Sequence, residues 1–282
     1  MLTQGPILSI VIPCYNQGIY LKDTLDSLAA ADRDRVETII INDGSTDAYT
    51  NDYLRELSGQ GYHVIFQENQ GLGAARNRGI REARGKYILP LDSDNKILPE
   101  YISKGLAVME QQADIAVVYG NAEYFGEKQG ILKPGPFNLQ KLMLGNFIDA
   151  CAVIRKSVVE EVGYYDNMKI MGLEDWDLWL RIALKGHKFY YVDEVLFNYR
   201  VHQSSMLRTL NRDIRRQNEI EDYFTQKYRD QLSFTVVKDY FIGKLKRRPF
   251  HFFYRLALQK YFPAYYERKI REGRMYKGWL YE

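Results

Sequence analysis

The chain has 282 residues, of which 46% are hydrophobic and 27% charged; this composition supplies a buried core and excludes wholesale disorder. Its two cysteines, Cys14 and Cys151, lie in apolar surroundings, which excludes a disulfide scaffold or a cysteine zinc site and favours a reducing compartment. No stretch approaches the roughly 18 apolar residues of a membrane-spanning helix, and no basic segment precedes the first apolar run. We therefore expect a cytoplasmic protein without a signal peptide or a membrane span.

The net charge of +3 is unevenly distributed. Residues 238–282 contain 12 Lys and Arg, 4 Asp and Glu, and 13 aromatic residues. The preceding 237 residues contain 27 Lys and Arg against 32 Asp and Glu. We therefore expect a mildly acidic body, residues 1–206, and a basic, aromatic-rich helical region, residues 207–282, with different roles.

Apolar runs and amphipathic stretches alternate over the first 120 residues. The near-continuously apolar runs, typical of strands buried on both faces, are Ile7–Pro13, Val36–Asn42, His63–Glu68, Lys86–Leu91 and Ile115–Gly120. Helix-like stretches lie between them, at Gly18–Ala31, Asp47–Leu57, Gly71–Ala83 and Pro99–Met109. This alternation predicts an α/β fold with a mostly parallel sheet and helices on both faces. Pro90 cannot donate to a sheet ladder, so it is expected at the end of its strand.

After about residue 121 the pattern becomes mixed. We expect a loop at Lys133–Phe137, a short strand at Cys151–Arg155 and a short helix at Ser157–Val162. The stretch Glu174–Lys185 is an amphipathic helix, because its apolar residues recur with helical spacing, and Gly186 ends it. Beyond about residue 205 the composition is helical.

Short polar residues follow four of the expected strands. These segments are Pro13–Asn16, Asn42–Ser45, Asn69–Gly71 and Asp92–Asn95. In an open α/β sheet, ligands bind beyond the carboxyl ends of the parallel strands. We therefore expect the four segments to converge on one site.

Asp92-Ser93-Asp94 carries the clearest chemistry of the four. Two carboxylates one residue apart, on a turn after a buried strand, can bind a hard divalent cation such as Mg²⁺ or Mn²⁺. The alternative is a solvated acidic turn, since Asp, Ser and Asn are favoured in turns anyway.

Asp43 also has two interpretations. It accepts an N–H from a nucleobase, or it belongs to a turn in which Ser45 or Thr46 caps the next helix.

The segment Gly71–Arg76 has glycine spacing that superficially resembles a dinucleotide-binding loop. Arg76 occupies the third glycine position, and no acidic residue closes the following strand in the usual way. We therefore reject a dinucleotide-binding loop and expect Arg76 to reach a phosphate from its helix.

Two further groups lie later in the chain. Glu174 and Asp175 open the Trp-rich helix, where acidic residues complement the helix dipole; a carboxylate anchored beside tryptophans is also suited to general-base catalysis. His202 follows the last strand-like segment and is either structural or a ligand of a metal or a diphosphate. Asn121, Glu123 and Asp149 are polar groups that could line an acceptor pocket, with surface loops favoured for the first two.

Together the segments resemble family 2 glycosyltransferases with the GT-A fold. The matching segments are SIVIPCYNQ (Ser9–Gln17), IIINDGSTD (Ile39–Asp47), NQGLGAARNRGI (Asn69–Ile80), GKYILPLDSDN (Gly85–Asn95), GLEDWDLWLRIALKG (Gly172–Gly186) and YRVHQSS (Tyr199–Ser205). They follow the order of the family and cover roughly residues 5–206.

The resemblance implies a role for each matching residue. On the nucleotide-sugar side, Pro13, Tyr15 and Asn16 border the nucleotide, Asp43 binds the base, Arg76 lies near the base and phosphates, and Asp92 and Ser93 meet the ribose. Asp94 binds the metal, and His202 the metal or the diphosphate. Asp175 is implied to be the catalytic base, with Glu174 supporting it or touching the acceptor.

The resemblance also implies the reaction. It is a metal-dependent, inverting transfer from a nucleotide-diphosphate sugar, with UDP as the favoured nucleotide and Mn²⁺ or Mg²⁺ as the cofactor. The acceptor is a hydroxyl of a glycan or lipid-linked glycan in cell-surface polysaccharide assembly. Two alternatives stay open: a nucleotide-sugar-binding scaffold that has lost catalysis, and a nucleotidyltransferase, which would need a glycine- and arginine-rich loop where this chain has CYNQG.

The basic C-terminal region has three interpretations. Its aromatic residues can pack on the body or on a second subunit of a homo-oligomer. They can lie at a membrane interface with Lys and Arg on anionic lipid, or stack on single-stranded nucleic acid. Among the functional roles, the resemblance favours peripheral contact with the inner face of the cell membrane and disfavours nucleic acid.

Overall fold

A computed structural model describes residues 5–32, 34–166, 168, 172–202, 213–231, 238, 242–243 and 245–272. They fall into two compact units. The first contains the described residues up to Phe137 together with Ile148–His202; the second contains Asn138–Phe147 and the described residues after position 212. The expected boundary between residues 206 and 207 lies outside the described residues, so the division into domains 1–206 and 207–282 stays a prediction.

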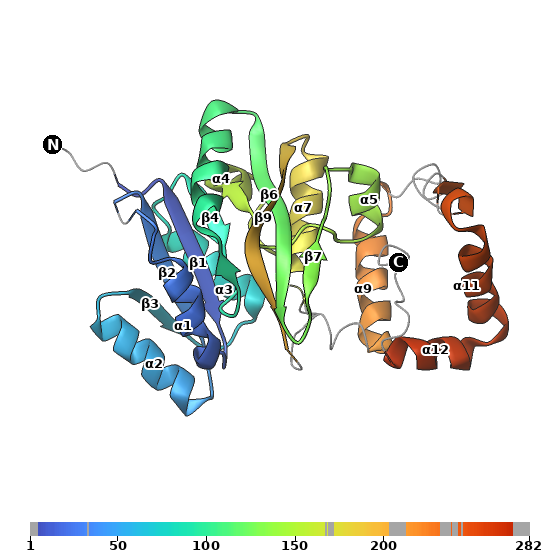
Figure 1. Cartoon of the computed structure of the whole chain (residues 1–282), viewed down its shortest axis with the longest axis horizontal. Helices are drawn as coiled ribbons and strands as arrows, with labels where there is room; N and C mark the ends of the chain where they lie inside the picture. Colours follow the sequence, from blue (N-terminus) through green and yellow to red (C-terminus); the bar gives the residue numbers. More distant parts are fainter. Residues whose placement is uncertain are drawn as a thin grey trace. The chain divides into compact units, whose positions relative to one another are not determined.

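Strands and helices alternate through the N-terminal part of the first unit (Figure 1). In chain order they are β1 (Leu8–Cys14), α1 (Gly18–Ser27), β2 (Val36–Asp43), α2 (Ala48–Gly59), β3 (His63–Gln67), α3 (Leu72–Glu82), β4 (Tyr87–Pro90), β5 (Lys96–Ile97), α4 (Pro99–Gln111) and β6 (Ile115–Gly126). All the strands and helices expected before residue 120 are present, although α1 ends earlier and β6 continues further than expected. Pro90 is the last residue of β4, as its missing N–H requires.

The later elements of this unit complete one sheet. They are β7 (Gly130–Leu132), β8 (Val153–Arg155), α6 (Lys156–Glu161), α7 (Glu174–Leu184) and β9 (Lys188–Val201). The strand order is β3-β2-β1-β4-β8-β6-β9-β5, with β7 paired to β6. Strands β1, β2, β3, β4, β6 and β9 run in one direction, whereas β5, β7 and β8 run against them. The expected mostly parallel sheet is therefore confirmed, with antiparallel strands added after β4.

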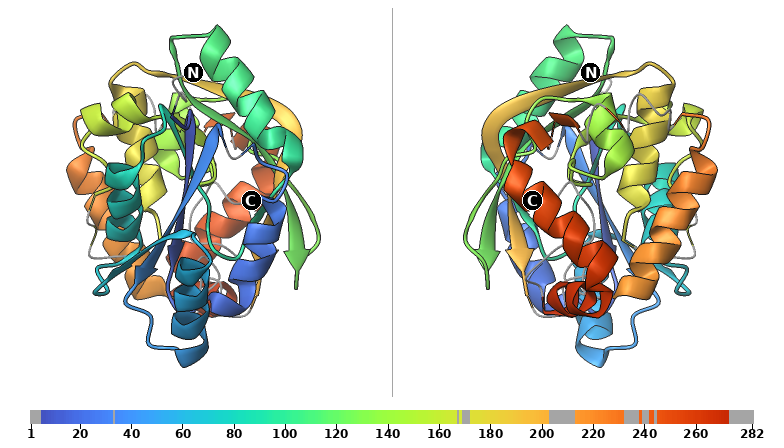
Figure 2. Two further views of the ribbon diagram at one scale, coloured as in Figure 1. Left: turned by 90° about the vertical axis from the view of Figure 1, so that its left-hand side faces the viewer. Right: turned by 90° about the vertical axis from the view of Figure 1, so that its right-hand side faces the viewer.

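Helices cover both faces of this sheet (Figure 2). Every residue of β1 is buried, and alternate side chains face opposite layers. Ile10 and Ile12 belong to the core that contains Leu21 of α1, whereas Val11 lies against α3. A Cβ at Gly79 of α3 would lie 2.3 Å from Val11 Cγ1, so this glycine allows α3 to approach β1 closely.

The mixed region contains more strand than its composition predicted. The loop Lys133–Phe137 and the strand at β8 are confirmed. The expectation of a surface loop at Asn121 is wrong, because Asn121 is buried in β6 and its side-chain amide bonds Asp193 at 3.0 Å. Pairing with β7 and β9 holds this polar end of β6 in a strand; hydrophobicity alone does not indicate it.

The second unit is helical in its described residues. It contains α5 (Leu139–Leu144), α9 (Ile214–Lys227), α11 (Pro249–Tyr261) and α12 (Pro263–Arg271). Asp213 caps α9 by accepting hydrogen bonds from the backbone of Arg215 and Arg216. A small core forms between α11 and α12 from Leu258, Tyr266 and Ile270. No helix in the described part of the chain is long and apolar enough to cross a membrane.

Candidate active site

Asn16 joins the loops that follow β1 and β2. Its backbone N–H donates to Ser45 Oγ at 3.0 Å, and its side-chain oxygen accepts from the backbone of Thr46 and Asp47 at 2.8 and 2.9 Å. Asn16 has a φ of 56°, a left-handed conformation that asparagine tolerates better than most residues. The expectation that Ser45 or Thr46 caps the next helix is wrong, since Asp47 is the N-cap of α2 and accepts from Thr50 N. Ser45 and Thr46 instead contact Asn16.

Asp43, at the end of β2, is buried and organises the loop before α3. Its carboxylate accepts hydrogen bonds from Gln67 Nε2 at 2.7 Å and from the backbone N–H groups of Gln70 and Gly71, both at 2.9 Å. The next residue, Gly44, has a φ of 66°, and a Cβ there would lie 2.5 Å from Asn69 N. Asp43 and Gly44 therefore fix how closely the loop after β2 approaches the loop before α3. Contact between Asp43 and a nucleobase stays a prediction.

Arg76 of α3 is buried and bonds the carboxylate that ends the β4 segment. Its Nη2 lies 2.7 Å from Asp92 Oδ1, and its guanidinium carbon lies 5.4 Å from the centre of the Tyr165 ring. Burial alone would lower the pKa of Arg76, but the charge of Asp92 and of other nearby acidic groups raises it, so the guanidinium is permanently charged. Arg76 Nε and Tyr165 Oη are buried without a hydrogen-bond partner in the described chain. Such unsatisfied groups are unusual in a closed interior and are expected where a ligand completes the site.

The second carboxylate of the turn, Asp94, contacts the end of β9. Its Oδ2 lies 3.1 Å from His202 Nε2, and the His202 ring stacks on Tyr20 of α1 at 5.1 Å between ring centres. Burial and the neighbouring charge of Asp92 raise the pKa of Asp94 to about 6, against the lowering effect of His202. The structure therefore brings together the two residues that the sequence nominated as metal ligands.

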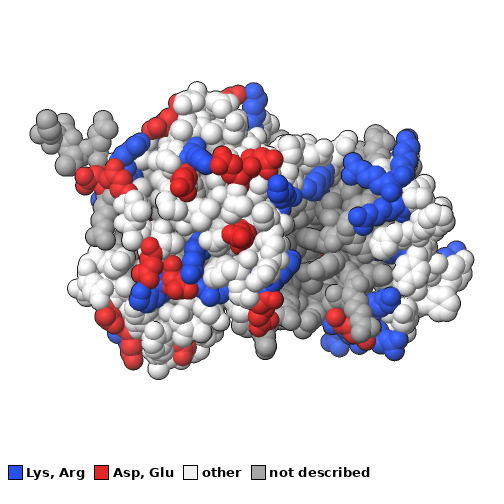
Figure 3. Space-filling model, in the orientation of Figure 1, with Lys and Arg blue, Asp and Glu red and all other residues white. Residues whose placement is uncertain are grey.

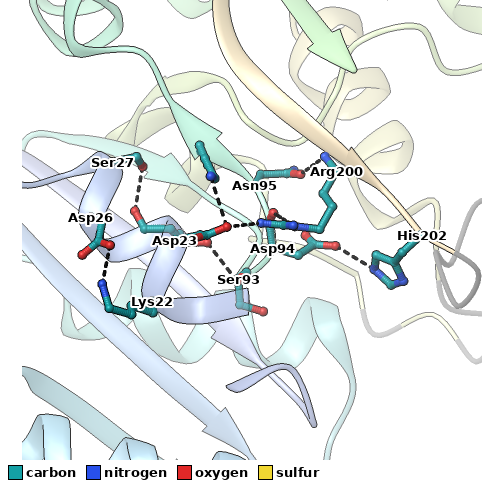
Figure 4. A network of polar contacts seen from close by, with 11 residues as sticks. Lys22, Asp23, Asp26, Ser27, Ser93, Asp94, Asn95, Arg200 and His202 are labelled. Carbon is teal, nitrogen blue, oxygen red and sulfur yellow. Dashed lines mark hydrogen bonds and ion pairs between the residues drawn. The ribbon is translucent and has the colours of Figure 1, made fainter. Parts of the chain in front are cut away.

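Arg200 holds this arrangement in place, although the sequence analysis assigned it no role. Its Nη2 lies 2.6 Å from Asp23 Oδ2 of α1, and its Nε donates to the backbone oxygen of Asp94 at 2.9 Å. Its backbone N–H donates to Asn95 Oδ1 at 2.9 Å. Figure 4 shows Arg200 between Asp23 and the Asp94–Asn95 turn. This one side chain links α1, the turn after β4 and β9.

The remaining residues expected around the nucleotide differ in exposure. Tyr15 presents nearly half of its surface to solvent, whereas Pro13 is buried within β1. Ser93 is buried, and its hydroxyl donates to Gln17 Oε1 at 2.7 Å. Ser93 thus holds the turn against the segment before α1, and its contact with a ribose stays a prediction.

Glu174 and Asp175 form the first turn of α7, as expected. Glu174 is buried, and both of its carboxylate oxygens accept from Gly172 N at 3.1 Å. Asp175 is half-buried, and its Oδ1 accepts from Trp176 N at 2.8 Å. Both carboxylates lie close enough to Arg76 to raise its pKa. Arg76 therefore bonds the acidic turn after β4 and is influenced by the charges in the first turn of α7.

Asp149 is a further carboxylate of this site. Its Oδ1 accepts from Cys151 N at 2.8 Å, and the flanking backbone is held by Trp179 Nε1, which donates to Ile148 O at 3.0 Å, and by Tyr101 Oη, which donates to Cys151 O at 2.7 Å. Burial raises the pKa of Asp149 to about 7, and the charges of Asp92 and Asp175 add to this. Asp149, which the sequence analysis offered as a residue that could line an acceptor pocket, thus lies close enough to Asp92 and Asp175 for their charges to influence it.

The residues present suit a cation carried by a diphosphate. In the described part of the chain, no group of three or more His, Cys, Asp or Glu side chains could by itself enclose a metal. Asp94 and His202 contribute one carboxylate oxygen and one imidazole nitrogen. Mg²⁺ and Mn²⁺ are commonly bound by one or two carboxylates, with phosphates and water completing the coordination, so the carboxylate of Asp94 fits either ion. The imidazole nitrogen of His202 is a ligand that a transition-metal ion such as Mn²⁺ accepts more readily than Mg²⁺ does.

Two family models match the chain. The model described as glycosyl transferase family 2 matches residues 9–163, and the model described as glycosyl transferase family group 2 matches residues 87–268. EpsH of Bacillus subtilis is 30% identical over 220 residues, which are 73% of this chain and 64% of EpsH. The glycosyltransferase GlyA of Streptococcus pneumoniae is 29% identical over 71% of this chain, and the match spans 31% of its own length.

Solved structures share the fold at low sequence identity. S. aureus TarS (residues 1–349) in complex with UDP-GlcNAc has a TM-score of 0.59 at 19% identity, over 70% of this chain and 59% of that one. The mannosyltransferase PcManGT from Pyrobaculum calidifontis, in complex with GDP-Man and Mn²⁺, has a TM-score of 0.58 at 15% identity, over 99% of this chain and 89% of that one. The expected α/β architecture with C-terminal helices therefore has solved counterparts.

Proposed function

Because the chain belongs to glycosyltransferase family 2 and has the GT-A fold, we propose that it transfers a sugar from a nucleotide-diphosphate sugar to a hydroxyl of a glycan or lipid-linked glycan. The observation that carries this proposal is the position of Arg76. It bonds Asp92 at 2.7 Å and lies close enough to Glu174 and Asp175 for their charges to raise its pKa. One buried cation thus links the proposed donor side of the site to the proposed base.

The donor is bound by groups from several loops. Arg76 Nε, which is buried without a hydrogen-bond partner among the described residues, donates to an oxygen of the diphosphate, and Asp92 beside it accepts from the ribose. Tyr15 offers an exposed ring to the nucleobase. We favour a UDP-sugar; the relatives of known structure include complexes with UDP-GlcNAc and with GDP-Man.

Asp94 and His202 would hold a divalent cation, Mn²⁺ or Mg²⁺, against the diphosphate. When bound, that cation supplies positive charge against the developing charge of the leaving nucleotide diphosphate. Arg200 keeps the turn that carries Asp94 in register with His202. Asp94 and His202 are therefore proposed as a binding pair whose separation is set by the protein.

Asp175 is the proposed general base. It takes a proton from the acceptor hydroxyl, which attacks the anomeric carbon from the face opposite the diphosphate and inverts the centre. Glu174, fixed by Gly172 N, supports the first turn of α7 and keeps Asp175 oriented. Asp149 lies close enough to Asp175 to be influenced by its charge, and we propose that it accepts from a sugar hydroxyl.

The main alternative is a scaffold that binds nucleotide sugars without turnover. The joint presence of Asp43, Asp92, Asp94 and Asp175 in the sequence argues against it, because loss of catalysis usually erodes such groups. Titration calorimetry with UDP, GDP and dTDP, with and without Mn²⁺, tests the proposal. Tight metal-dependent binding of one nucleotide, together with release of that nucleotide from its sugar conjugate, is the expected result. Binding of none of them would overturn the donor site, whereas binding without any transfer or hydrolysis would favour the scaffold.

A further inference from the structure

Helix α11 presents its aromatic side chains outward. Phe250 is 90% exposed, Tyr261 66% and Phe253 59%. Tyr254 and Leu256 are also exposed. Most of these residues recur at intervals of three, four or seven and so share one side of the helix. We call Phe250, Phe253, Tyr254, Leu256 and Tyr261 the aromatic face of α11.

The opposite side of α11 contains a buried charge. Arg255 is fully buried, and its Nη2 donates to Tyr266 Oη of α12 at 3.0 Å. Leu258 lies on the same side, in the small core with Tyr266 and Ile270. A helix in water normally buries its apolar side chains and exposes its charges, whereas α11 buries Arg255 and exposes several aromatic side chains, with the exposed Lys260 beside them. The hydrophobic effect therefore favours covering the aromatic face.

The aromatic face continues onto α12 through a shared lysine. Lys269 Nζ lies 5.6 Å from the centre of the Tyr254 ring and 5.2 Å from that of Tyr265, and it donates to Tyr254 Oη at 3.2 Å. The Arg268 guanidinium lies 5.1 Å from the Tyr265 ring. Phe262, at the corner between the two helices, is 61% exposed. Exposed phenylalanines thus lie on α11, and the tyrosines next to them contact lysine and arginine side chains of α12.

Positive charge surrounds this surface. Eight Lys and Arg lie between positions 245 and 272, of which Arg255 alone is buried, against two acidic residues, Glu267 and Glu272. Lys246, Arg247 and Arg248 are exposed immediately before α11. Figure 3 shows most of the blue side chains of this region in an upper and a lower group, with mainly uncharged surface between them. The partner that fits must therefore be apolar at its centre and anionic at its edge.

We propose that the aromatic face of α11, with Phe262 and Tyr265, docks on the surface of an anionic lipid bilayer. Phenylalanine side chains enter the acyl boundary, tyrosines lie at headgroup depth, and the surrounding Lys and Arg contact lipid phosphates. A second copy of the same surface would bring two positive rims together, which electrostatics disfavours. This inference goes beyond glycosyl transfer and stands independently of it, since it requires neither donor nor acceptor.

Flotation of the full chain with vesicles tests the inference. Neutral phosphatidylcholine vesicles are compared with vesicles that also contain phosphatidylglycerol, at low and high salt. We expect binding to the anionic vesicles alone, weakened by salt because the contact is partly electrostatic. Phe250→Ser/Phe253→Ser should lower the bound fraction by at least about tenfold through lost apolar burial, and Arg247→Glu/Arg248→Glu should lower it on anionic vesicles.

Matched controls come from the other unit. Tyr49→Ser removes an aromatic ring that is 55% exposed on α2, and Arg55→Glu reverses an exposed charge on the same helix; both should bind vesicles like the parent chain. Circular dichroism checks that each variant is folded. Absence of vesicle binding, or equal binding by the folded Phe250/Phe253 double variant, would overturn the inference. Self-association that this double variant abolishes, without vesicle binding, would assign the surface to a second copy instead.

Discussion

His202 Nε2 lies 3.1 Å from Asp94 Oδ2, although 108 positions separate the two residues in the chain. The contact forms because β9 pairs with β5, the short strand that directly follows the turn after β4, so that the C-terminal end of β9 lies beside this turn. Arg200, two residues before His202, bonds that turn through its side chain and its backbone. The pairing of a long strand thus assembles the proposed cation site.

Removing either member of this pair should weaken cation-dependent donor binding. Asp94→Ala and His202→Ala should each raise the Kd for UDP in the presence of Mn²⁺ by roughly tenfold or more, since each removes one protein ligand. In the double variant, the loss of binding free energy should be smaller than the sum of the losses in the two single variants, because the two residues act as a unit. Calorimetry with UDP and Mn²⁺ measures this. His187→Ala, which removes a histidine paired with Glu161, is the control, and an unchanged Kd in Asp94→Ala would refute the site.

Arg200 is expected to act on the donor through the turn, as a positioning residue. Arg200→Gln removes a 2.6 Å ion pair to Asp23 and the hydrogen bond to Asp94 O, which should cost about 1–3 kcal/mol of stability. It should also weaken Mn²⁺-dependent UDP binding at temperatures where the variant is folded. Arg84→Gln breaks the ion pair with Glu37 and serves as the control. Reduced stability with unaltered UDP affinity would assign Arg200 a purely structural role.

Asp175→Asn should separate chemistry from binding. The amide keeps the shape of the side chain but cannot take the proton of the acceptor hydroxyl. Turnover should therefore fall by about 10²–10⁴-fold, while the Kd for the nucleotide changes little. A coupled assay for nucleotide release, run beside calorimetry, measures both quantities. Asp114→Asn, at an exposed ion pair with Lys188, should retain turnover. Normal turnover in Asp175→Asn would show that another group is the base.

Asp149 should make the stability of the fold depend on pH. Burial raises its pKa from 3.8 to about 7, so the folded state binds this proton more tightly than the unfolded state does. The protonated Asp149 side chain therefore makes its full contribution to the free energy of unfolding below about pH 4. This contribution falls as the pH rises and is lost above about pH 7. Asp149→Asn should therefore gain stability relative to the parent chain across this range, by roughly 2–4 kcal/mol.

Thermal unfolding at a series of pH values tests the Asp149 prediction. The difference in Tm between Asp149→Asn and the parent chain should grow from pH 4 to pH 7 and then level off. Asp114→Asn is again a suitable control, because the pKa of Asp114 is lowered by its hydrogen bond to Lys188 and no such gain is expected. A constant difference in Tm across the series would contradict the raised pKa.

Two glycines offer a matched test of packing. Gly79→Ala places a Cβ 2.3 Å from Val11 Cγ1 and should destabilise the fold by about 1–3 kcal/mol, because α3 cannot retreat from β1 without loss of contact. Gly59→Ala, in α2, meets nothing within 4 Å and should be neutral or slightly stabilising. Denaturant unfolding of both variants compares them directly. Equal stabilities would mean that α3 shifts freely on the sheet.

The alternation of apolar runs with amphipathic stretches was enough to predict the α/β class and the first strands and helices. Strands such as β1 are buried on both faces, so their hydrophobicity is continuous and visible in the sequence. The same pattern predicted that the polar residues after each strand lie close together, because the carboxyl ends of parallel strands lie at one edge of the sheet. Asp92, Asp94 and Arg76 could therefore be nominated before any contact was known.

The tertiary structure alone decided which of these groups touch. Asp43 and Ser93 are occupied by protein partners, whereas Arg76 Nε has none in the described chain. The roles of Arg200 and Asp149 depend on strand pairing and on backbone held from Trp179 and Tyr101, which no local pattern encodes. Periodicity reports which side of an element is buried, because burial follows the pitch of the helix or strand. It does not report which distant side chain lies opposite, since that depends on how the whole sheet pairs.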